Sequence, residues 1–189
     1  MAGMNDSPAL RERLRSDLQT FAATNSDMAL VASAFLHLLA DPAAFMRERL
    51  AGHFTGSAWL VSADSQRVLL MYHRKLDRWL QPGGHADGDA DLAAVALREA
   101  TEETGLRDLH VEPGIFDLDA HRIPARGDVP EHTHYDVRYV IRALGSEVPQ
   151  GNAESLALAW VEVAALRDDL VIDPSIRRMA ICWEITNFR

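Results

Sequence analysis

Residues 83–106 form the segment that most restricts the fold of this chain. A Pro-Gly-Gly loop at 82–84 leads through an acidic stretch into a helix predicted from about Asp91 to Thr104, and Gly105 is suited to end it. At about 100° per residue, one helix face is small and apolar: Ala93, Ala96, Leu97 and Ala100. Such a face suits close packing on a β-sheet, so the segment predicts an α/β protein.

A second face of the same helix is acidic. It carries glutamates at positions i, i+3 and i+4, namely Glu99, Glu102 and Glu103. Two carboxylates about 4 Å apart repel by about 4 kcal/mol at an effective dielectric near 20, and Arg98 is the helix's one basic residue. A solvated acidic face is the alternative, but a bound cation would offset the repulsion. Carboxylate ligands favour Mg²⁺, which also binds substrate phosphates.

This segment resembles the Nudix box, whose pattern is Gly, five residues, Glu, seven residues, Arg-Glu, an aliphatic residue, any residue, Glu-Glu, any residue, Gly and an aliphatic residue. With Gly84 as the first glycine, the later positions fall in register: Arg98-Glu99, Glu102-Glu103 and Gly105-Leu106. The chain departs from the pattern at the first glutamate, where it has Ala90. The neighbouring Asp89 or Asp91 is a candidate substitute for that glutamate.

The resemblance implies a Nudix-like α/β/α sandwich with a mixed β-sheet over residues 52–189, preceded by an N-terminal helical extension at 1–51. It implies a metal-dependent pyrophosphohydrolase that cleaves a diphosphate linkage in a nucleoside diphosphate derivative, with Mg²⁺ or Mn²⁺ as cofactor. The divalent metal would neutralise the phosphates and activate water. The partner is therefore expected to be a small-molecule diphosphate.

The resemblance also assigns roles to residues. The metal-binding acids of the family match Glu99, Glu102 and Glu103, and the carbonyl of Gly83 matches a backbone ligand. Arg98 matches the arginine that orients one of those carboxylates. The general base is expected to be a box glutamate or a residue of a later loop, with Glu154 as the candidate.

Two other readings of the residues stay open. His132, His134 and Asp136 would lie on one face of a predicted strand and could bind a transition metal, which favours a non-haem iron or cupin-like metalloenzyme. Ala90 favours a Nudix-fold sensor that binds a nucleotide-like ligand without hydrolysing it. Within the Nudix interpretation, the candidate contacts to substrate phosphates are His85, His134 and Arg138, together with His121.

Periodicity predicts the remaining organisation. The N-terminal region predicts three helices, which begin at Ser7-Pro8, after Ser26 or Asp27, and at Asp41-Pro42, the third running through Leu50. From Gly52 onward the pattern predicts short strands at 58–61, 68–71, 134–142 and 156–161, a long loop at 123–133, a short helix at 164–170 and a last helix from Asp173-Pro174.

Composition excludes several classes of function. The formal net charge of −9 disfavours non-specific binding to nucleic acid or to an anionic membrane. A single cysteine, Cys182, cannot close an intrachain disulfide and is expected to be buried. The N-terminal residues lack the apolar core of a signal peptide, so we expect a soluble, cytoplasmic protein. The N-terminal helices would serve either a homodimer contact or packing on the domain.

Overall fold

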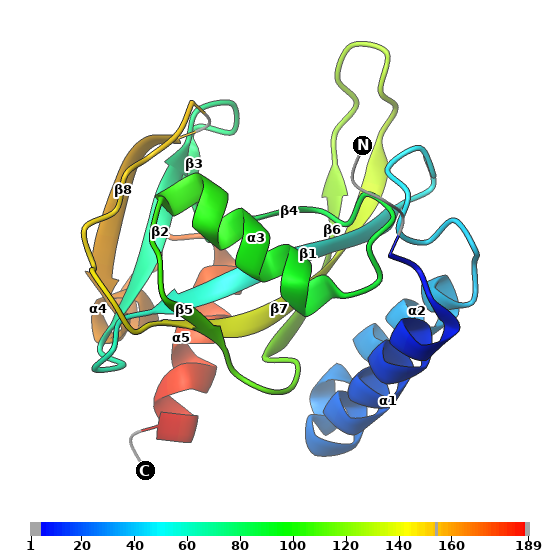
Figure 1. Cartoon of the computed structure of the whole chain (residues 1–189), viewed down its shortest axis with the longest axis horizontal. Coiled ribbons are helices and arrows are strands. Elements are labelled where there is room, and N and C mark those ends of the chain that lie inside the picture. The colour runs from blue at the N-terminus through cyan, green and yellow to red at the C-terminus, as the bar shows by residue number, and fades with distance from the viewer. Residues whose placement is uncertain (1–4, 154, 188–189) are drawn as a thin grey trace. The chain divides into compact units, whose positions relative to one another are not determined.

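The computed structural model describes residues 5–153 and 155–187. Its helices are α1 (Pro8–Thr24), α2 (Ala29–Leu39), α3 (Leu92–Thr104), α4 (Val163–Asp168) and α5 (Pro174–Asn187), with a 3₁₀ turn at Ser26–Met28. Its strands are β1 (His53–Val61), β2 (Arg67–His73), β3 (Arg78–Leu80), β4 (Gly83–His85), β5 (Leu109–Val111), β6 (Asp117–Ile123), β7 (His132–Ala143) and β8 (Ser155–Glu162). The predicted α/β class with N-terminal helices is confirmed (Figure 1). No helix in the described ranges is long and apolar enough to cross a membrane.

Hydrogen bonds join the strands in the order β3-β2-β1-β7-β5, with β4 on β1, β6 on β7 and β8 on β2. The chain divides into two compact units. The first consists of Met1–Gly56, Gly84–Val95 and Pro113–Tyr139, and the second of Ser57–Gly83, Ala96–Glu112 and Val140–Arg189. Strands β1, β4 and β7 and helix α3 therefore each contribute residues to both units. The predicted domain boundary between residues 51 and 52 stays a prediction.

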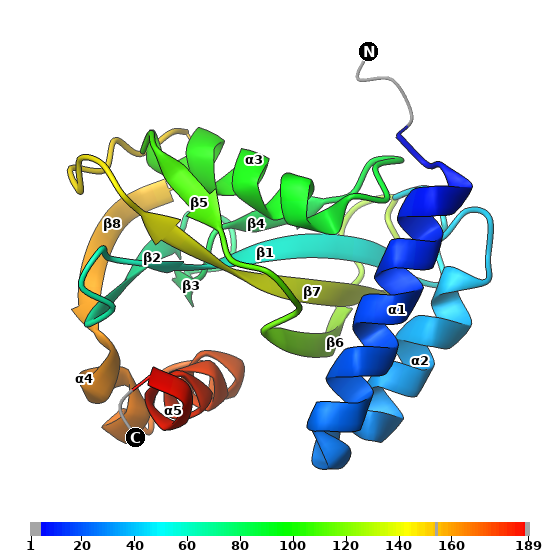
Figure 2. The ribbon, with the colours of Figure 1, turned by 60° about the horizontal axis from the view of Figure 1, so that its bottom comes forward.

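The first unit contains the N-terminal helices, α1 and α2, which lie side by side in both views (Figures 1 and 2). Helix α1 begins as predicted, because the Ser7 hydroxyl accepts a hydrogen bond from the Leu10 amide at 3.3 Å and Pro8 fills the first helical position. Apolar side chains at helical spacing are buried on each helix: Leu14, Leu18 and Phe21 on α1, and Ala32, Phe35, Leu38 and Leu39 on α2. Burial of this shared face holds the pair together.

The prediction of a third helix was wrong for the segment from Asp41-Pro42 through Leu50. Residues 42–50 form successive turns, with backbone bonds from Ala44 to Asp41 and from Arg49 to Met46. The Asp41 carboxylate accepts from the Ala43 amide at 2.8 Å and from the Arg49 guanidinium at 2.9 Å. An aspartate that bonds nearby groups in this way competes with the helical backbone pattern, so the start signal at Asp41 begins a turn.

The second unit is built around β2. This strand pairs antiparallel with β3 and with β8, and Val68 pairs with Val61 at the end of β1, which confirms the strands predicted at 58–61 and 68–71. Helices α4 and α5 lie side by side (Figure 2). The predicted last helix forms as α5, and its apolar stripe is buried: Ile176, Met179, Ala180 and Trp183. The Trp183 indole N–H donates to the Ser65 carbonyl at 3.0 Å, which ties α5 to the β1–β2 turn.

Two further predictions need correction. The segment from 123 to 133 is shorter as a loop than expected, because β6 ends at Ile123 and β7 begins at His132. Strand β6 escaped prediction because one face carries Asp117, Asp119 and His121, and the other combines Leu118 and Ala120 with Arg122, so no clear apolar run marks it. Cys182 is exposed rather than buried, since it lies outside the apolar stripe of α5.

Candidate functional site

Helix α3 carries the candidate active-site acids. It begins at Leu92 and ends at Thr104, followed by Gly105 with φ of +67°, so the predicted span and its glycine end are confirmed. The buried face is displaced slightly from the predicted one: Ala96 and Ala100 are buried, whereas Leu92 and Val95 are buried in place of Ala93 and Leu97. In the first unit, Gly56 permits close packing of the first turn, because a Cβ there would lie 2.7 Å from the Leu92 carbonyl oxygen.

Glu103 and Gly83 come together in the second unit. The Glu103 side chain is buried, with 5% of the residue exposed, and its Oε2 accepts a hydrogen bond from the Gly83 amide at 2.9 Å. Position 83 has no room for a side chain, because a Cβ would lie 2.2 Å from the Ser57 hydroxyl. The hydrogen bond that the Gly83 amide donates thus holds the backbone of Gly83 against the Glu103 carboxylate. The carbonyl of the same residue is the backbone metal ligand that the resemblance implies.

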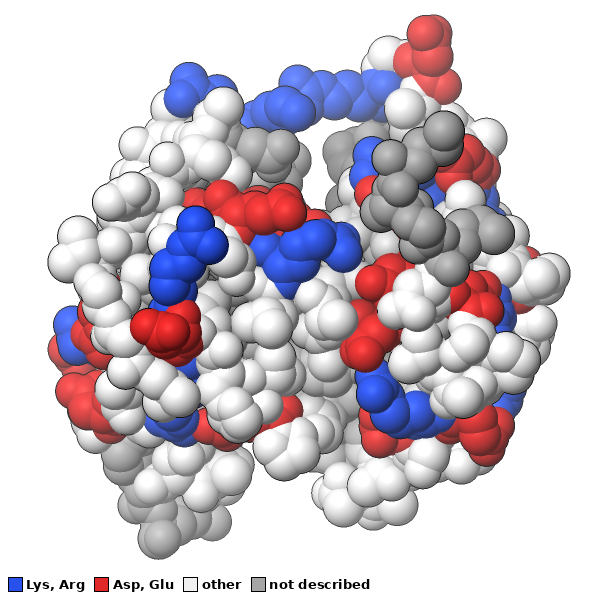
Figure 3. Space-filling model, in the orientation of Figure 1, with Lys and Arg blue, Asp and Glu red and all other residues white. Residues whose placement is uncertain are grey.

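Glu99 and Glu102 differ in their surroundings. The Glu99 carboxylate is mostly buried and forms an ion pair with Arg98 at 3.1 Å. The orienting role expected of Arg98 stays a prediction. Glu102 is exposed, and its backbone carbonyl accepts a hydrogen bond from the side-chain amide of Asn152 at 3.3 Å. Acidic and basic side chains lie next to one another over α3 in the space-filling view (Figure 3). Glu154, the candidate base, lies outside the described residues.

Position 90, where the Nudix box has its first glutamate, is buried and hydrogen-bonded to the N-terminal segment. Ala90 is 2% exposed, and its amide donates to the Asn5 carbonyl at 3.0 Å. The Asp89 carboxylate accepts from the Asn5 side chain at 3.0 Å. Asp91 pairs with Arg13 at 2.7 Å and accepts from the Ala94 amide in the first turn of α3. Both candidate substitutes for the first glutamate are therefore engaged in local structure of the first unit.

Arg138 lies in a buried ionic network of the first unit. Its guanidinium, 3% exposed, pairs with Asp136 at 2.8 Å, Asp117 at 3.0 Å and Asp119 at 3.2 Å. Burial opposes its charge, but the three aspartates outweigh burial and raise the pKa of Arg138. A guanidinium enclosed by carboxylates is not presented to a phosphate, so we drop the predicted substrate contact of Arg138.

The same network removes Asp136 from the predicted iron site. Its carboxylate accepts from the Thr55 hydroxyl at 2.9 Å and from Arg138. The third side chain near His132 and His134 is instead His53, at the start of β1. Among the described residues, these three histidines each place one ring nitrogen within 4.8 Å of the others. His53 was not among the predicted site residues, because it is the first residue of β1 and precedes the apolar run predicted at 58–61.

His85 and His121 also lie at this cluster. The His85 ring centre is 5.0 Å from that of His134, and the His121 ring centre is 5.6 Å from it. Burial first, and nearby basic groups second, lower the pKa of His85 to about 4 and that of His134 to about 2. Burial also lowers the pKa of His53. At neutral pH these three imidazoles are uncharged, which makes them poor phosphate clamps and good metal ligands.

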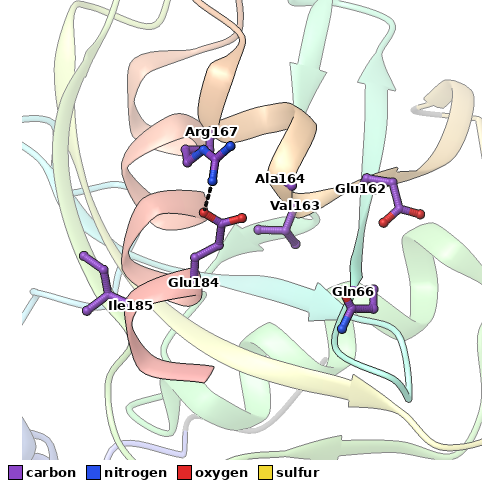
Figure 4. Close-up of a pocket in the computed structure, with 7 residues that line it drawn as sticks. All are labelled: Gln66, Glu162, Val163, Ala164, Arg167, Glu184 and Ile185. Carbon is purple, nitrogen blue, oxygen red and sulfur yellow. Dashed lines mark hydrogen bonds and ion pairs between the residues drawn. The ribbon is translucent and has the colours of Figure 1, made fainter. Parts of the chain in front are cut away.

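A pocket of about 430 Å³ opens in the second unit between α4, α5 and the turn before β2 (Figure 4). Arg167 and Glu184 face each other at its wall and form an ion pair at 2.9 Å. Hydrogen bonds to Asp168 and Glu184 raise the pKa of Arg167. None of the described residues that line this pocket is one of the predicted site residues, so it does not enter the candidate active site.

Known proteins resemble this chain over most of its length. Residues 53–179 match the model of the NUDIX domain. Over 72 residues the chain is 42% identical to CMP-5'-(N-acetyl-N-hydroxy-3-aminopropyl)phosphonate hydrolase of Streptomyces rubellomurinus (strain ATCC 31215), which covers 34% of this chain and 35% of that protein. The match thus spans about a third of the length of this curated relative.

Solved structures show the same fold. A NUDIX-family hydrolase from Clostridium perfringens is 28% identical with a TM-score of 0.54, over 71% of this chain and 97% of its own. A MutT protein from Methanosarcina mazei Go1 is 15% identical with a TM-score of 0.58, over 75% and 99%. Dihydroneopterin triphosphate pyrophosphohydrolase from E. coli is 19% identical with a TM-score of 0.56, over 70% and 95%. The last two likenesses show the fold alone, and they agree with the sandwich and mixed sheet expected from the sequence.

Proposed function

This chain belongs to the Nudix hydrolase family, and on that basis we propose that it cleaves a diphosphate linkage in a nucleoside diphosphate derivative with the help of a divalent metal. The observation that carries the proposal is the pairing of Glu103 with Gly83. A buried carboxylate at the end of the glutamate stripe is fixed against the backbone of Gly83, the first residue of β4. Together with Glu99 and Glu102 it forms an all-oxygen set in the register of the Nudix box.

The donor set fits Mg²⁺ or Mn²⁺, because hard divalent cations prefer carboxylate and carbonyl oxygens. Glu99, Glu102, Glu103 and the Gly83 carbonyl would hold the ion. A bound ion would neutralise the diphosphate and lower the pKa of a coordinated water. Without it, the acidic face of α3 would repel an anionic substrate.

The chain's own residues then keep the acids in place. The Gly83 amide holds Oε2 of Glu103, and the Arg98 guanidinium holds Oε1 of Glu99. Fixing these carboxylates before substrate binds reduces the reorganisation needed during the reaction. Glu154 or a box glutamate remains our proposal for the base that takes a proton from the attacking water.

The experiment is product analysis with the purified chain, Mg²⁺ or Mn²⁺, and a panel of diphosphates. The panel contains nucleoside diphosphate sugars, dinucleoside polyphosphates, nucleoside triphosphates and a CMP-linked phosphonate. We expect at least one to be cleaved at a phosphorus anhydride and cleavage to stop with EDTA. Glu103→Gln should lower kcat by about 100-fold or more, since metal stabilisation of the transition state contributes several kcal/mol.

The matched control is Glu162→Gln, which removes one negative charge from an exposed acid at the end of β8. Glutamine at position 103 can still accept from the Gly83 amide, so circular dichroism should show an unchanged fold. Full activity in Glu103→Gln, or equal losses in both variants, would contradict the assignment. Tight binding of a diphosphate without turnover would favour the sensor interpretation instead.

A further inference from the structure

We infer that His53, His132 and His134 form a second metal site, which binds a transition-metal cation such as Zn²⁺ through three imidazole nitrogens. All three residues lie in the first unit, at the starts of β1 and β7. The proposed hydrolysis uses none of them. The inference therefore stands independently of the proposed function.

Ring positions match those of a metal bound by three histidines. The ring centres form a nearly equilateral triangle, with sides of 5.1 Å for His53–His132, 5.0 Å for His53–His134 and 5.1 Å for His132–His134. A tetrahedral ion with Zn–N bonds of about 2.0–2.1 Å, and imidazole centres about 1.1 Å beyond each nitrogen, would place those centres about 5.2 Å apart. The observed triangle already has this size.

The nitrogen atoms agree with the same geometry. Nε2 of His132 and Nε2 of His134 form a hydrogen bond at 3.2 Å, so without an ion one of the two nitrogens carries a proton that metal binding would move to Nδ1. The same separation is close to the roughly 3.3 Å between two ligands of a tetrahedral zinc ion. The His53 nitrogen lies within 4.8 Å of both. Drawing it to the ligand distance requires a shift of no more than about 1.5 Å.

Backbone carbonyls set the tautomers that metal binding requires. Nδ1 of His53 faces the Arg49 carbonyl at 3.3 Å, and Nδ1 of His132 faces the Pro130 carbonyl at 2.9 Å. A carbonyl only accepts, so each Nδ1 carries the proton and each Nε2 carries the lone pair. This arrangement, with a carbonyl behind the ligating imidazole, is common around protein-bound zinc.

His53 supplies an observation that points directly to a ligand. The residue is 2% exposed, and its buried Nε2 has no hydrogen-bond partner within residues 5–153 and 155–187. Leaving a buried polar atom unpaired costs about 1–3 kcal/mol, and a metal ion among the three rings would remove that cost. Neutral nitrogen donors favour Zn²⁺, Co²⁺ or Ni²⁺ over Mg²⁺, so this site and the oxygen set on α3 select different ions.

Three protein ligands leave one position of a tetrahedral ion for water or for another side chain. The His85 ring is the nearest further imidazole that the structure gives, with its centre 5.2 Å from His53 and 5.0 Å from His134. The site is therefore either open to solvent ligands or closed by a fourth histidine. Both forms bind the ion through the same three residues.

The test measures Zn²⁺ binding to the full chain produced without a histidine tag and stripped with EDTA. Equilibrium dialysis against buffered Zn²⁺, with metal quantified by mass spectrometry, should give one ion per chain in the presence of excess Mg²⁺. His53→Ala and His134→Ala should each weaken binding by at least about 100-fold, because removal of a mere orienting group already costs 10–100-fold. The control His110→Ala, an exposed histidine on β5, should bind like the parent chain.

A second measurement guards against misfolded variants. Co²⁺ added to the intact parent chain should give the intense visible absorption of a tetrahedral ion, which octahedral carboxylate sites do not produce. Glu103→Gln should keep both signals. Loss of Zn²⁺ in Glu103→Gln with retention in the histidine variants would locate the ion on α3 and overturn the inference, as would a parent chain that binds no Zn²⁺.

Discussion

Replacement of Arg138 by methionine should strongly destabilise the protein. The substitution keeps an unbranched side chain in place but leaves Asp117, Asp119 and Asp136 without their shared cation. Two of these partners are also buried, with side-chain exposures of 7% for Asp117 and 3% for Asp136 against 3% for the arginine. Water therefore cannot replace the lost interactions.

The magnitude follows from the burial of the network. Removing one partner of a buried ion pair costs about 3–5 kcal/mol, since the remaining charge is left uncompensated. In a chain of this length, 1 kcal/mol shifts the melting temperature by about 2–4 °C, so Arg138→Met should lower it by about 6–20 °C. The matched control is Arg122→Met on β6, whose pair with Glu131 is 80% and 56% exposed and should contribute less than about 1 kcal/mol.

Urea unfolding at several pH values is the appropriate assay. The deficit of Arg138→Met relative to the parent chain should narrow as the pH falls from 8 toward 4–5, because the aspartates that lost their cation can then take up protons. The same pH change should leave the small effect of Arg122→Met nearly constant. A loss below about 1 kcal/mol in Arg138→Met, or a deficit that grows at acidic pH, would refute the reasoning.

Two further predictions concern other parts of the molecule. Gly83→Ala should reduce both stability and hydrolysis, because its Cβ would lie 2.2 Å from the Ser57 hydroxyl and 2.7 Å from the Ser57 Cβ. In thermal melting, the double variant with Ser57→Gly should recover part of the lost stability. A Gly83→Ala variant as stable as the parent chain would contradict the steric argument. In metal-free protein, stability should fall as the pH drops below about 6.5, the ordinary histidine pKa. The folded chain holds the pKa of His85 at about 4 and that of His134 at about 2, so the unfolded chain takes up protons first and stability declines by up to about 1.4 kcal/mol per pH unit for each histidine. Urea unfolding at pH 7.5 and 5 measures this, and greater stability at pH 5 would contradict it.

Local signals explain which elements the sequence predicted. Three helices have local signals that lie within a few turns of the chain, and all three helices form: the Ser7-Pro8 start of α1, the Ala–Glu pattern of α3 and the apolar stripe of α5. The helix expected from Asp41 failed because a side-chain contact to Arg49 outweighs local propensity. Strand β6 was missed because its polar face is buried against an arginine of another strand.

The site residues also fall into those that a local pattern predicts and those that depend on contacts between distant strands. The register of the glutamates on α3 follows from helix geometry, and the sequence therefore identified Glu99, Glu102 and Glu103 as neighbours. The histidine cluster depends on β1 meeting β7, which no local pattern encodes, so His132 and His134 were found while His53 was not. Asp136 was assigned to the wrong partner because Arg138, two residues away on the same strand face, competes for it.

The alanine at position 90 also bears on how this chain could change by mutation. Its amide is bound by Asn5, and a glutamate there would bury a carboxylate at a site that is 2% exposed. A buried, unpaired charge costs several kcal/mol, so a single Ala90→Glu substitution would be penalised. The backbone amide at position 90 would still donate to the Asn5 carbonyl, so the penalty comes from the glutamate side chain alone. A change from alanine to the glutamate of the family pattern therefore requires a second substitution that opens space or supplies a cation beside position 90.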